Sequence, residues 1–356
     1  MNPKALIHRA ARLLLGKNIW MVSDRVNAAD DNGEAFFAYL QDKPVRSFFV
    51  LEKHSPDYDR LRRVGRTVPF GSLRYHLLCA AAAVNVSSQM ELRCPYAKEV
   101  FLQHGVIMND LHRYLNRLYN DRLYMLVSGE AERKRVTGGA FVMPEDHVWL
   151  TGLPRFDRLE DRDAKKVIVC LTWRARFAGL SDEALRKSDY WAALTRLMND
   201  EALKHGLAER GYTLAMRLHP NMIGRLPLEQ IPDDVEVFQG SYRDMFAQGS
   251  LLITDYSSVV FDFAYLGKPF IYYQFDRDSF FDGSHSFDKG DVDYEKEGLG
   301  EVILDHDTLR AAILAYADSG CAVTAEYRER TERFFAHRDR ENCRRVYEKI
   351  RELTGD

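Results

Sequence analysis

The chain has 356 residues, of which 46% are hydrophobic and 29% charged, and its formal net charge is −3. A single hydrophobic core stops growing at about 250–300 residues, so this length and composition predict two globular domains. The nearly neutral charge argues against nucleic-acid binding, which usually requires a strongly basic face. The five cysteines follow no disulfide or zinc spacing, which indicates reduced thiols in a cytoplasmic protein.

The first predicted element is a basic amphipathic helix at the N-terminus. No acidic residue precedes Asp24, and Leu6, Ala10, Leu13 and Leu14 fall at helical spacing. Such a helix can lie on an anionic bilayer, or it can pack as an ordinary first helix on its own domain. The sequence contains no run of about 18 apolar residues and no apolar signal-peptide segment, so we expect no membrane span and no export.

Apolar, β-rich runs alternate with helical patterns along the chain, which is typical of parallel sheets. The first half predicts strands at 19–23, 47–50, 84–87, 100–103, 124–128 and 147–150, with helices at 33–40, 72–82 and 111–118. The second half predicts strands at 166–172, 213–217, 235–238, 251–254 and 270–273, with helices at 190–206, 242–247 and 258–266.

A Gly/Pro turn at 152–155 is followed by a charged stretch, which predicts a linker. The expected domains are therefore 1–157 and 158–326, followed by a helical segment at 327–356. We expect two doubly wound, Rossmann-like α/β domains that face each other across a ligand cleft at the carboxyl ends of their strands.

Three predicted strands of the second half end in polar side chains. The run Asp255–Ser258 begins a helix, where hydroxyls and free backbone N–H groups suit a phosphate, although ordinary N-capping is the alternative. Arg217 and His219 end another strand and suit phosphate oxygens, although a histidine before proline is often structural. Thr172 and Arg174 end the third strand, and they either line the cleft or pack between the domains.

In the first half, a strand runs into Gln103, His104 and Gly105. Imidazole is the usual general base for a hydroxyl nucleophile, and glycine allows close approach of the backbone. Three Asp-x-Asp triplets at 161–163, 276–278 and 291–293 lie in charged, loop-like sequence and are expected by chance, so we predict no metal site. Walker-type, dinucleotide and serine-hydrolase motifs are absent.

An ordered set of short segments resembles the CDP-glycerol glycerophosphotransferase family, which includes the teichoic-acid primases and polymerases. The resemblance covers nearly the whole chain from about Ile19. The matching segments are 19–20, 31–37, 103–105, 151–157, 172–174, 217–220, 253–258, 261–263, 268–269 and 297–300.

This resemblance implies a GT-B fold whose C-terminal helix crosses back to the first domain. It implies transfer of a phospho-polyol from CDP-glycerol or CDP-ribitol to a glycan or lipid-linked acceptor, with no metal and no cofactor. The second domain would hold the donor, and the protein would work at the inner face of the cell membrane. Carried over to matching positions, it implies His104 as the base. The implied donor residues are Thr172, Arg174, Arg217, His219, Asp255, Tyr256, Ser257, Ser258 and Glu297, and the acceptor-side residues are Asp31, Asn32, Gly105 and Arg155.

One departure from the family pattern concerns the acceptor. His104-Gly105 continues with Val106-Ile107-Met108, which leaves the acceptor and the donor alditol open and allows a capsule or other surface glycan. Two other functions fit some of the same motifs: a GT-B glycosyltransferase that uses CMP-sialic acid, and a membrane-associated glycan-assembly scaffold without catalysis.

Overall fold

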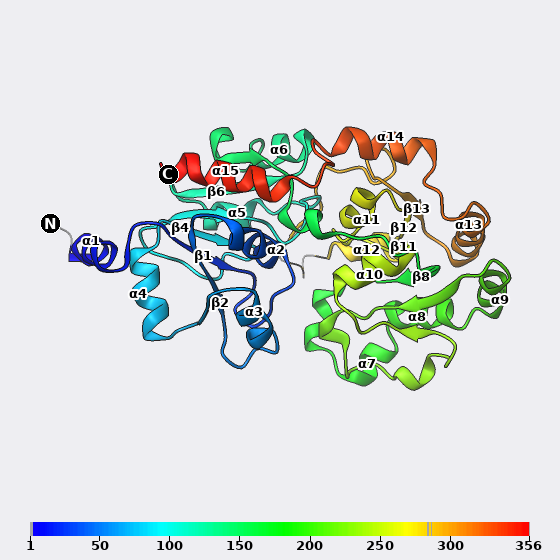
Figure 1. Cartoon of the computed structure of the whole chain (residues 1–356). Helices are drawn as coiled ribbons and strands as arrows, with labels where there is room; N and C mark the ends of the chain where they lie inside the picture. The colour runs from blue at the N-terminus through cyan, green and yellow to red at the C-terminus, as the bar shows by residue number, and fades with distance from the viewer. Residues whose placement is uncertain (1–2, 283–284, 286, 356) are drawn as a thin grey trace. The chain divides into compact units, whose positions relative to one another are not determined.

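The computed structural model describes residues 3–282, 285 and 287–355, apart from the side chains of residues 3–6. The chain folds into two compact units (Figure 1). Unit 1 comprises Met1–Val106, His112–Arg158 and Phe334–Asp356, and unit 2 comprises Ile107–Leu111 and Leu159–Arg333. The linker predicted after the turn at 152–155 therefore lies beside the observed division between Arg158 and Leu159.

Unit 1 is built on a parallel sheet of seven strands in the order β3-β2-β1-β4-β5-β6-β7. The chain runs outwards from β1 to β3 and then returns to the other side of β1, so the direction of winding reverses between β1 and β4. Ladder pairs such as Trp20 with Val84 set the register across this point. The strands are β1 (Ile19–Ser23), β2 (Arg46–Leu51), β3 (Thr67–Pro69), β4 (Val84–Ser87), β5 (Lys98–Phe101), β6 (Leu123–Val127) and β7 (Val148–Leu150).

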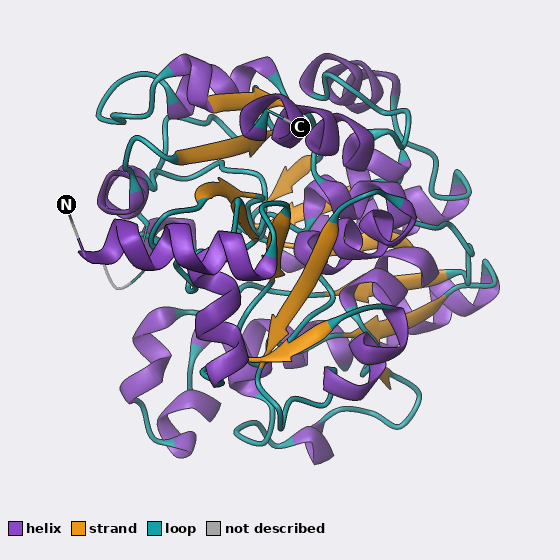
Figure 2. Cartoon of the chain, turned by 60° about the vertical axis from the view of Figure 1, so that its left-hand side comes forward, coloured by secondary structure: helices purple, strands orange, loops and turns teal. Residues whose placement is uncertain are grey.

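Helices cover the faces of this sheet, which is why its central strands β1 and β4 are buried along their whole length (Figure 2). In β1 all five residues are buried. The helices of unit 1 are α1 (Pro3–Leu15), α2 (Asn32–Tyr39), α3 (Tyr58–Val64), α4 (Leu73–Ala81), α5 (His112–Leu118), α6 (Glu130–Val136) and α15 (Asn342–Thr354).

Unit 2 repeats the plan with a parallel sheet of six strands in the order β10-β9-β8-β11-β12-β13. Here the winding reverses between β8 and β11, and Ile168 pairs with Leu252 across that point. The strands are β8 (Lys166–Val169), β9 (Thr213–Met216), β10 (Glu236–Val237), β11 (Gly249–Thr254), β12 (Phe270–Tyr273) and β13 (Glu301–Ile303). The helices are α7 (Asp182–Arg186), α8 (Asp189–Met198), α9 (Glu201–Glu209), α10 (Tyr242–Gln248), α11 (Val260–Leu266), α12 (Arg277–Phe280), α13 (His306–Asp318) and α14 (Ala325–Phe334).

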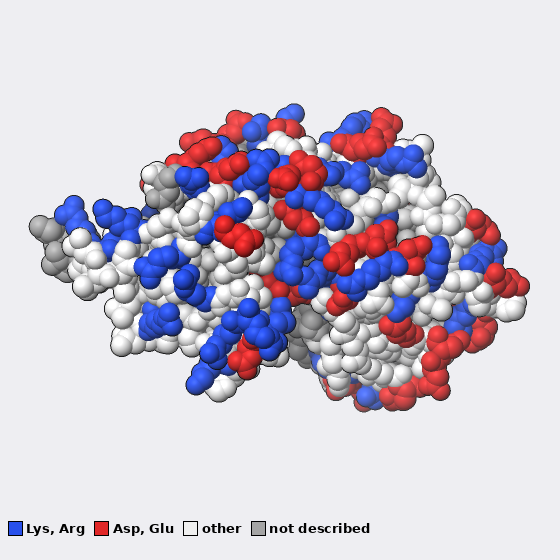
Figure 3. All heavy atoms as spheres, in the orientation of Figure 1, with Lys and Arg blue, Asp and Glu red and all other residues white. Residues whose placement is uncertain are grey.

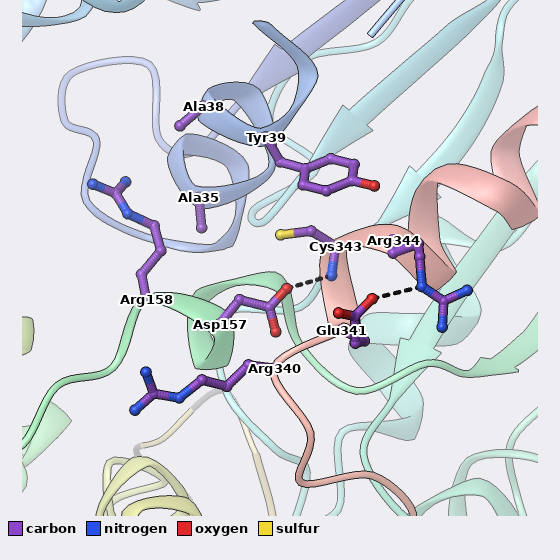
Figure 4. Close-up of a pocket in the computed structure, with 9 residues that line it drawn as sticks. All are labelled: Ala35, Ala38, Tyr39, Asp157, Arg158, Arg340, Glu341, Cys343 and Arg344. Carbon is purple, nitrogen blue, oxygen red and sulfur yellow. Dashed lines mark hydrogen bonds and ion pairs between the residues drawn. The ribbon is translucent and has the colours of Figure 1, made fainter. Parts of the chain in front are cut away.

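The last helix returns to unit 1, as the resemblance implies. Asp157 holds the start of α15: its carboxylate accepts hydrogen bonds from the backbone N–H of Asn342 at 3.0 Å and of Cys343 at 2.7 Å. A cavity of about 300 Å³ lies at this junction and contains none of the predicted site residues (Figure 4). It is lined by Ala35, Ala38, Tyr39, Asp157, Arg158, Arg340, Glu341, Cys343 and Arg344.

Three predicted helices differ from the structure. The segment 190–206 forms two helices, because Asp200 caps α9 by accepting a hydrogen bond from Leu203 N at 3.0 Å. The C-terminal segment likewise forms α14 and α15 rather than one run. The helix expected from 258 begins at Val260 with Val259 as its N-cap, and no side chain caps it.

Candidate active site

The polar residues predicted for donor binding follow three neighbouring strands of unit 2. β9 precedes Arg217 and His219, β8 precedes Thr172, and β11 precedes Asp255. Because β9, β8 and β11 are adjacent and parallel, these residues lie at one edge of the sheet. The winding of the sheet reverses between β8 and β11, and ligands of open α/β sheets bind at such a point.

Asp255 joins the loops that follow β8 and β11. Its Oδ1 accepts hydrogen bonds from Thr172 N at 2.8 Å, from Thr172 Oγ1 at 2.5 Å and from Tyr256 N at 2.7 Å. The side chain is completely buried and has no surface for a ligand, and it makes no capping hydrogen bond to α11. Ser257 and Ser258 remain partly exposed beside this junction. The two serines, rather than Asp255, therefore present polar groups to solvent here.

Arg174 differs from the expectation that it lines the donor site. Its side chain is fully buried, with Nε 2.8 Å from Asp276 Oδ2 and Nη2 2.8 Å from Asp255 Oδ2. Burial alone would lower the pKa of Arg174, but the two carboxylates outweigh it and raise the pKa above its ordinary value. Aromatic rings enclose the guanidinium, including Tyr256, which is itself stacked on Phe280. Arg174 is thus a positioning residue that holds Asp255.

Arg217 and His219 are partly exposed and held by aromatic side chains. The guanidinium of Arg217 lies 4.2 Å from the centre of the Tyr242 ring. The His219 ring stacks on Trp173 at 6.1 Å, and its Nδ1 accepts a hydrogen bond from Asn221 N at 3.2 Å. That bond leaves the proton of a neutral imidazole on Nε2, as a donor. His219 can therefore hold the local structure through Nδ1 and still donate a hydrogen bond to a ligand through Nε2.

Glu297 is exposed in the turn that precedes β13, where its Oε2 accepts a hydrogen bond from Asp293 N at 3.0 Å. Its predicted contact with a ribose stays a prediction. Each Asp-x-Asp triplet contains an aspartate that is paired with a cation. Asp161 pairs with Lys268 and Asp163 with Lys165, Asp276 pairs with Arg174, and Asp293 pairs with Lys296.

In unit 1 the corresponding point, between β1 and β4, is occupied by a carboxylate of the chain itself. Asp24 follows β1 and accepts hydrogen bonds at the start of α2 from Asp31 N, Gly33 N and Glu34 N, at 3.1, 2.7 and 3.0 Å. Ser88, which follows β4, donates to Asp24 at 2.5 Å. Burial, aided by the nearby Asp31, raises the pKa of Asp24 to about 7. The N–H groups that bind phosphate in many such folds are therefore already used.

His104 stands next to Asp31 in the same unit. Its Nδ1 lies 2.5 Å from Asp31 Oδ2, and its side chain is 57% exposed. Arg155 pairs with Asp31 Oδ1 at 2.9 Å and also donates to the carbonyl oxygen of His104. Burial would raise the pKa of Asp31, but His104 and Arg155 together lower it below its ordinary value. A carboxylate on Nδ1 leaves Nε2 as the basic nitrogen, which is the arrangement of a general base.

The backbone around His104 is fixed by Asn32, the first residue of α2. Its Nδ2 donates to Gln103 O at 2.8 Å, and its Oδ1 accepts from Arg155 N at 3.0 Å. Gln103 has a φ of 63°, a conformation that costs free energy for a residue other than glycine and that is often found at functional sites. The structure therefore brings together Asp31, Asn32, His104 and Arg155. Gly105 follows them without a positive φ, and its role stays a prediction.

Sequence reasoning missed two residues that shape these sites. Asp24 directly follows a predicted strand, so its position was a usable signal. Asp276 carried no such signal, because its partner Arg174 is 102 positions away and was expected at the surface of the site.

Comparisons with known proteins show the family to which the chain belongs. The family model described as CDP-glycerol:poly(glycerophosphate) glycerophosphotransferase matches residues 5–352. The minor teichoic acid biosynthesis protein GgaB of Bacillus subtilis (strain 168) is 30% identical over 99% of this chain, which spans 41% of that protein. A teichoic acid glycerol-phosphate transferase of Staphylococcus aureus (strain NCTC 8325 / PS 47) is 28% identical over 50% of this chain and 47% of its own length.

A solved structure of the wall teichoic acid polymerase TagF has the same fold. Its TM-score is 0.74 at 17% sequence identity, and the match covers 99% of this chain and 97% of that one. The chain belongs to the CDP-glycerol:poly(glycerophosphate) glycerophosphotransferase family and has its GT-B fold.

Proposed function

We propose that this chain transfers a phospho-alditol from a CDP-alditol to a hydroxyl group of a glycan acceptor and releases CMP. The oxygen of the acceptor hydroxyl attacks the β-phosphorus, the bond from that phosphorus to the bridging oxygen breaks, and CMP leaves with the bridging oxygen. The observation that carries this proposal is the pairing of His104 with Asp31 in a chain that belongs to this family.

His104 would act as the general base through Nε2. Its Nδ1 is engaged by Asp31, and Arg155 and Asn32 hold Asp31 and the His104 backbone in place. The hydroxyl proton would move to Nε2 as the new phosphorus–oxygen bond forms. General-base catalysis of this kind contributes about 10²- to 10⁴-fold in rate.

Unit 2 would hold the donor. Arg217 and His219 offer positive charge and an N–H donor, and Ser257 and Ser258 offer hydroxyls at the neighbouring strand end. Donors of these types suit the oxygens of a pyrophosphate, whose charge grows on the leaving CMP. We propose that these groups, and no metal ion, stabilise that charge; transfer that survives EDTA treatment would support this, and loss of transfer would contradict it.

The protein would work on the cytoplasmic side of a membrane, where a lipid-linked acceptor is exposed. In the part of the chain that the structure describes, no helix is long and apolar enough to cross a bilayer. α1 instead exposes Leu13 and Leu14, which are 81% and 85% accessible, and α4 exposes Leu73 at 77%. The side chain of Leu6, part of the predicted stripe, lies outside the described residues.

The charge of these two helices favours an anionic bilayer. Neither α1 nor α4 contains an acidic residue, and Arg9 and Arg74 are exposed on them. The surface over α1 and α4 accordingly shows blue and white atoms without red (Figure 3). α1 packs on unit 1 through His8, whose Nδ1 lies 2.5 Å from Ala80 O, and through the buried Ala11. The leucines at 13 and 14 therefore point away from the packed side.

The decisive experiment incubates the protein with CDP-glycerol or CDP-ribitol and a lipid-linked glycan acceptor. We expect CMP release and a product whose mass rises by one alditol-phosphate unit. His104→Ala should abolish release while the Kd for the donor stays unchanged by calorimetry. No CMP release with either donor, or full activity in His104→Ala, would reject the proposal. Binding to vesicles that contain phosphatidylglycerol, weakened in a Leu13→Ser, Leu14→Ser variant, tests the membrane contact separately.

A further inference from the structure

Two of the five cysteines meet inside unit 1. The thiol of Cys94 donates a hydrogen bond to the sulfur of Cys79 at a distance of 2.7 Å, although the residues are 15 positions apart. Cys79 lies on α4, and Cys94 lies in the segment between β4 and β5. The two side chains are 5% and 1% exposed and belong to the same hydrophobic cluster.

We propose that Cys79 and Cys94 form a redox-active dithiol that closes to a disulfide. The two sulfurs are already in direct contact, so bond formation requires only a small shift of the side chains. The other three cysteines have different surroundings. The Cys343 thiol donates to a backbone oxygen, Cys321 interacts with Tyr212, and the backbone carbonyl of Cys170 accepts a hydrogen bond from the Thr254 hydroxyl.

The hydrogen bond makes the two thiols chemically unequal. It lowers the pKa of Cys79, and the Tyr75 hydroxyl adds to this effect, although burial opposes it. The same bond and burial raise the pKa of Cys94 well above its ordinary value. Since the thiolate is the reactive form, Cys79 is the nucleophile and Cys94 the resolving thiol.

With hydrogen peroxide as the oxidant, the reaction balances in two steps. The Cys79 thiolate attacks one peroxide oxygen, the O–O bond breaks, and hydroxide leaves, which gives a sulfenic acid. The Cys94 sulfur then attacks the Cys79 sulfur, the S–O bond breaks, and the thiol proton leaves with the hydroxyl group as water. Two thiols are oxidised to one disulfide while the peroxide is reduced to two waters.

The disulfide would connect α4 with the segment that begins at Ser88. Ser88 hydrogen-bonds Asp24 beneath the start of α2, and α4 packs against α1 through Ala80 and His8. A crosslink that shortens the accessible unfolded chain stabilises the folded state. We therefore expect the oxidised protein to unfold at a higher temperature than the reduced protein.

The test counts thiols in the denatured full-length chain before and after treatment with hydrogen peroxide. The wild type should fall from five thiols to three, and dithiothreitol should restore all five. Cys79→Ser should keep its four thiols, and Cys94→Ser, which lacks the resolving thiol, should form no disulfide, whereas the matched control Cys170→Ser should fall from four to two. Peptide mapping of the wild type, which does not depend on the folding of any variant, should find one crosslink between Cys79 and Cys94.

A wild-type count that stays at five would overturn the proposal. So would a loss that dithiothreitol does not reverse, a crosslink that involves another cysteine or a second chain, or a loss of two thiols from Cys79→Ser.

Discussion

The substitution Asp31→Asn tests how the site orients His104. Oδ1 of Asp31 accepts two hydrogen bonds, from Asn32 N at 2.8 Å and from Arg155 Nη1 at 2.9 Å, while Oδ2 faces His104 Nδ1. An asparagine must place its amide oxygen where two donors converge, so its NH₂ group faces Nδ1. Nδ1 then becomes the acceptor, and the proton of the neutral ring moves to Nε2, which can no longer act as a base.

The size of the effect follows from the cost of the opposite amide orientation. That orientation would place an NH₂ group against both donors and lose one neutral and one charged hydrogen bond, or about 2–4 kcal/mol. The productive tautomer would then be about 30- to 1,000-fold less populated, and kcat should fall by the same factor. Donor affinity should not change, because the residues that we propose to bind the donor lie in unit 2.

The assay compares kcat for CMP release with the Kd for CDP-glycerol, and ¹⁵N NMR of the imidazole reports which nitrogen carries the proton. Asp59→Asn makes the same chemical change on the surface of unit 1, where the carboxylate of Asp59 lies 3.8 Å from Arg62, and should leave kcat unchanged. A kcat for Asp31→Asn within threefold of the wild type, or a proton that remains on Nδ1, would refute the reasoning.

Four other changes test separate parts of the structure. Arg217→Ala should raise the donor Kd by about 10- to 150-fold, the worth of a charged hydrogen bond, and an unchanged calorimetric Kd would contradict the assignment. Arg174→Met leaves the buried Asp255 and Asp276 uncompensated and should lower the free energy of unfolding by about 3–5 kcal/mol in urea titrations. Gly33→Ala places a Cβ 2.3 Å from Ser23 O and should cost about 1–3 kcal/mol in the same assay. Asp24 has a pKa of about 7 in the folded state against 3.8 in the unfolded chain, so its contribution to stability is complete below about pH 4 and declines towards pH 7. Urea titrations between about pH 4 and pH 7 should show this decline in the free energy of unfolding, and the part due to Asp24 should disappear in Asp24→Asn.

The sequence predicted the central strands well because their apolar runs are continuous. The expected ranges 19–23, 84–87 and 270–273 coincide with β1, β4 and β12. The edge strands β3 and β13 were missed because each has only three residues and a proline or a glutamate interrupts its apolar run, whereas the equally short β7 is apolar throughout and was predicted. Local pattern could also not separate α8 from α9, since the interruption depends on Asp200, which is held by His306 from a distant helix.

In the candidate site, too, features set by local sequence were predictable, and features set by distant contacts were not. The predicted strand ends correctly placed polar residues such as His104 and Arg217 at the carboxyl edges of the sheets, because parallel strands bring their carboxyl ends to one edge. Whether a side chain at a strand end is exposed or buried could not be predicted from local sequence. Arg174 stands beside Thr172 in sequence, yet it is buried because Asp255 and Asp276 pair with it from other loops. The contact between Cys79 and Cys94 likewise depends on the fold, since their spacing matches no known cysteine motif.

Two aspartates that lie beside the points of reversed winding support the proposal that unit 2 holds the donor. Asp24 follows β1, the first strand of its sheet, whereas Asp255 follows β11, which corresponds to β4, so the two aspartates lie beside the reversal of winding but on opposite strands of the central pair. Asp24 turns towards its own helix and accepts N–H groups from the start of α2, which excludes a phosphate from that position. Asp255 turns sideways to Thr172 and Arg174 and leaves the start of α11 uncapped by any side chain. Since an aspartate beside the reversal closes the site in unit 1 and leaves the start of a helix open in unit 2, we expect the pyrophosphate to bind to unit 2 rather than to unit 1.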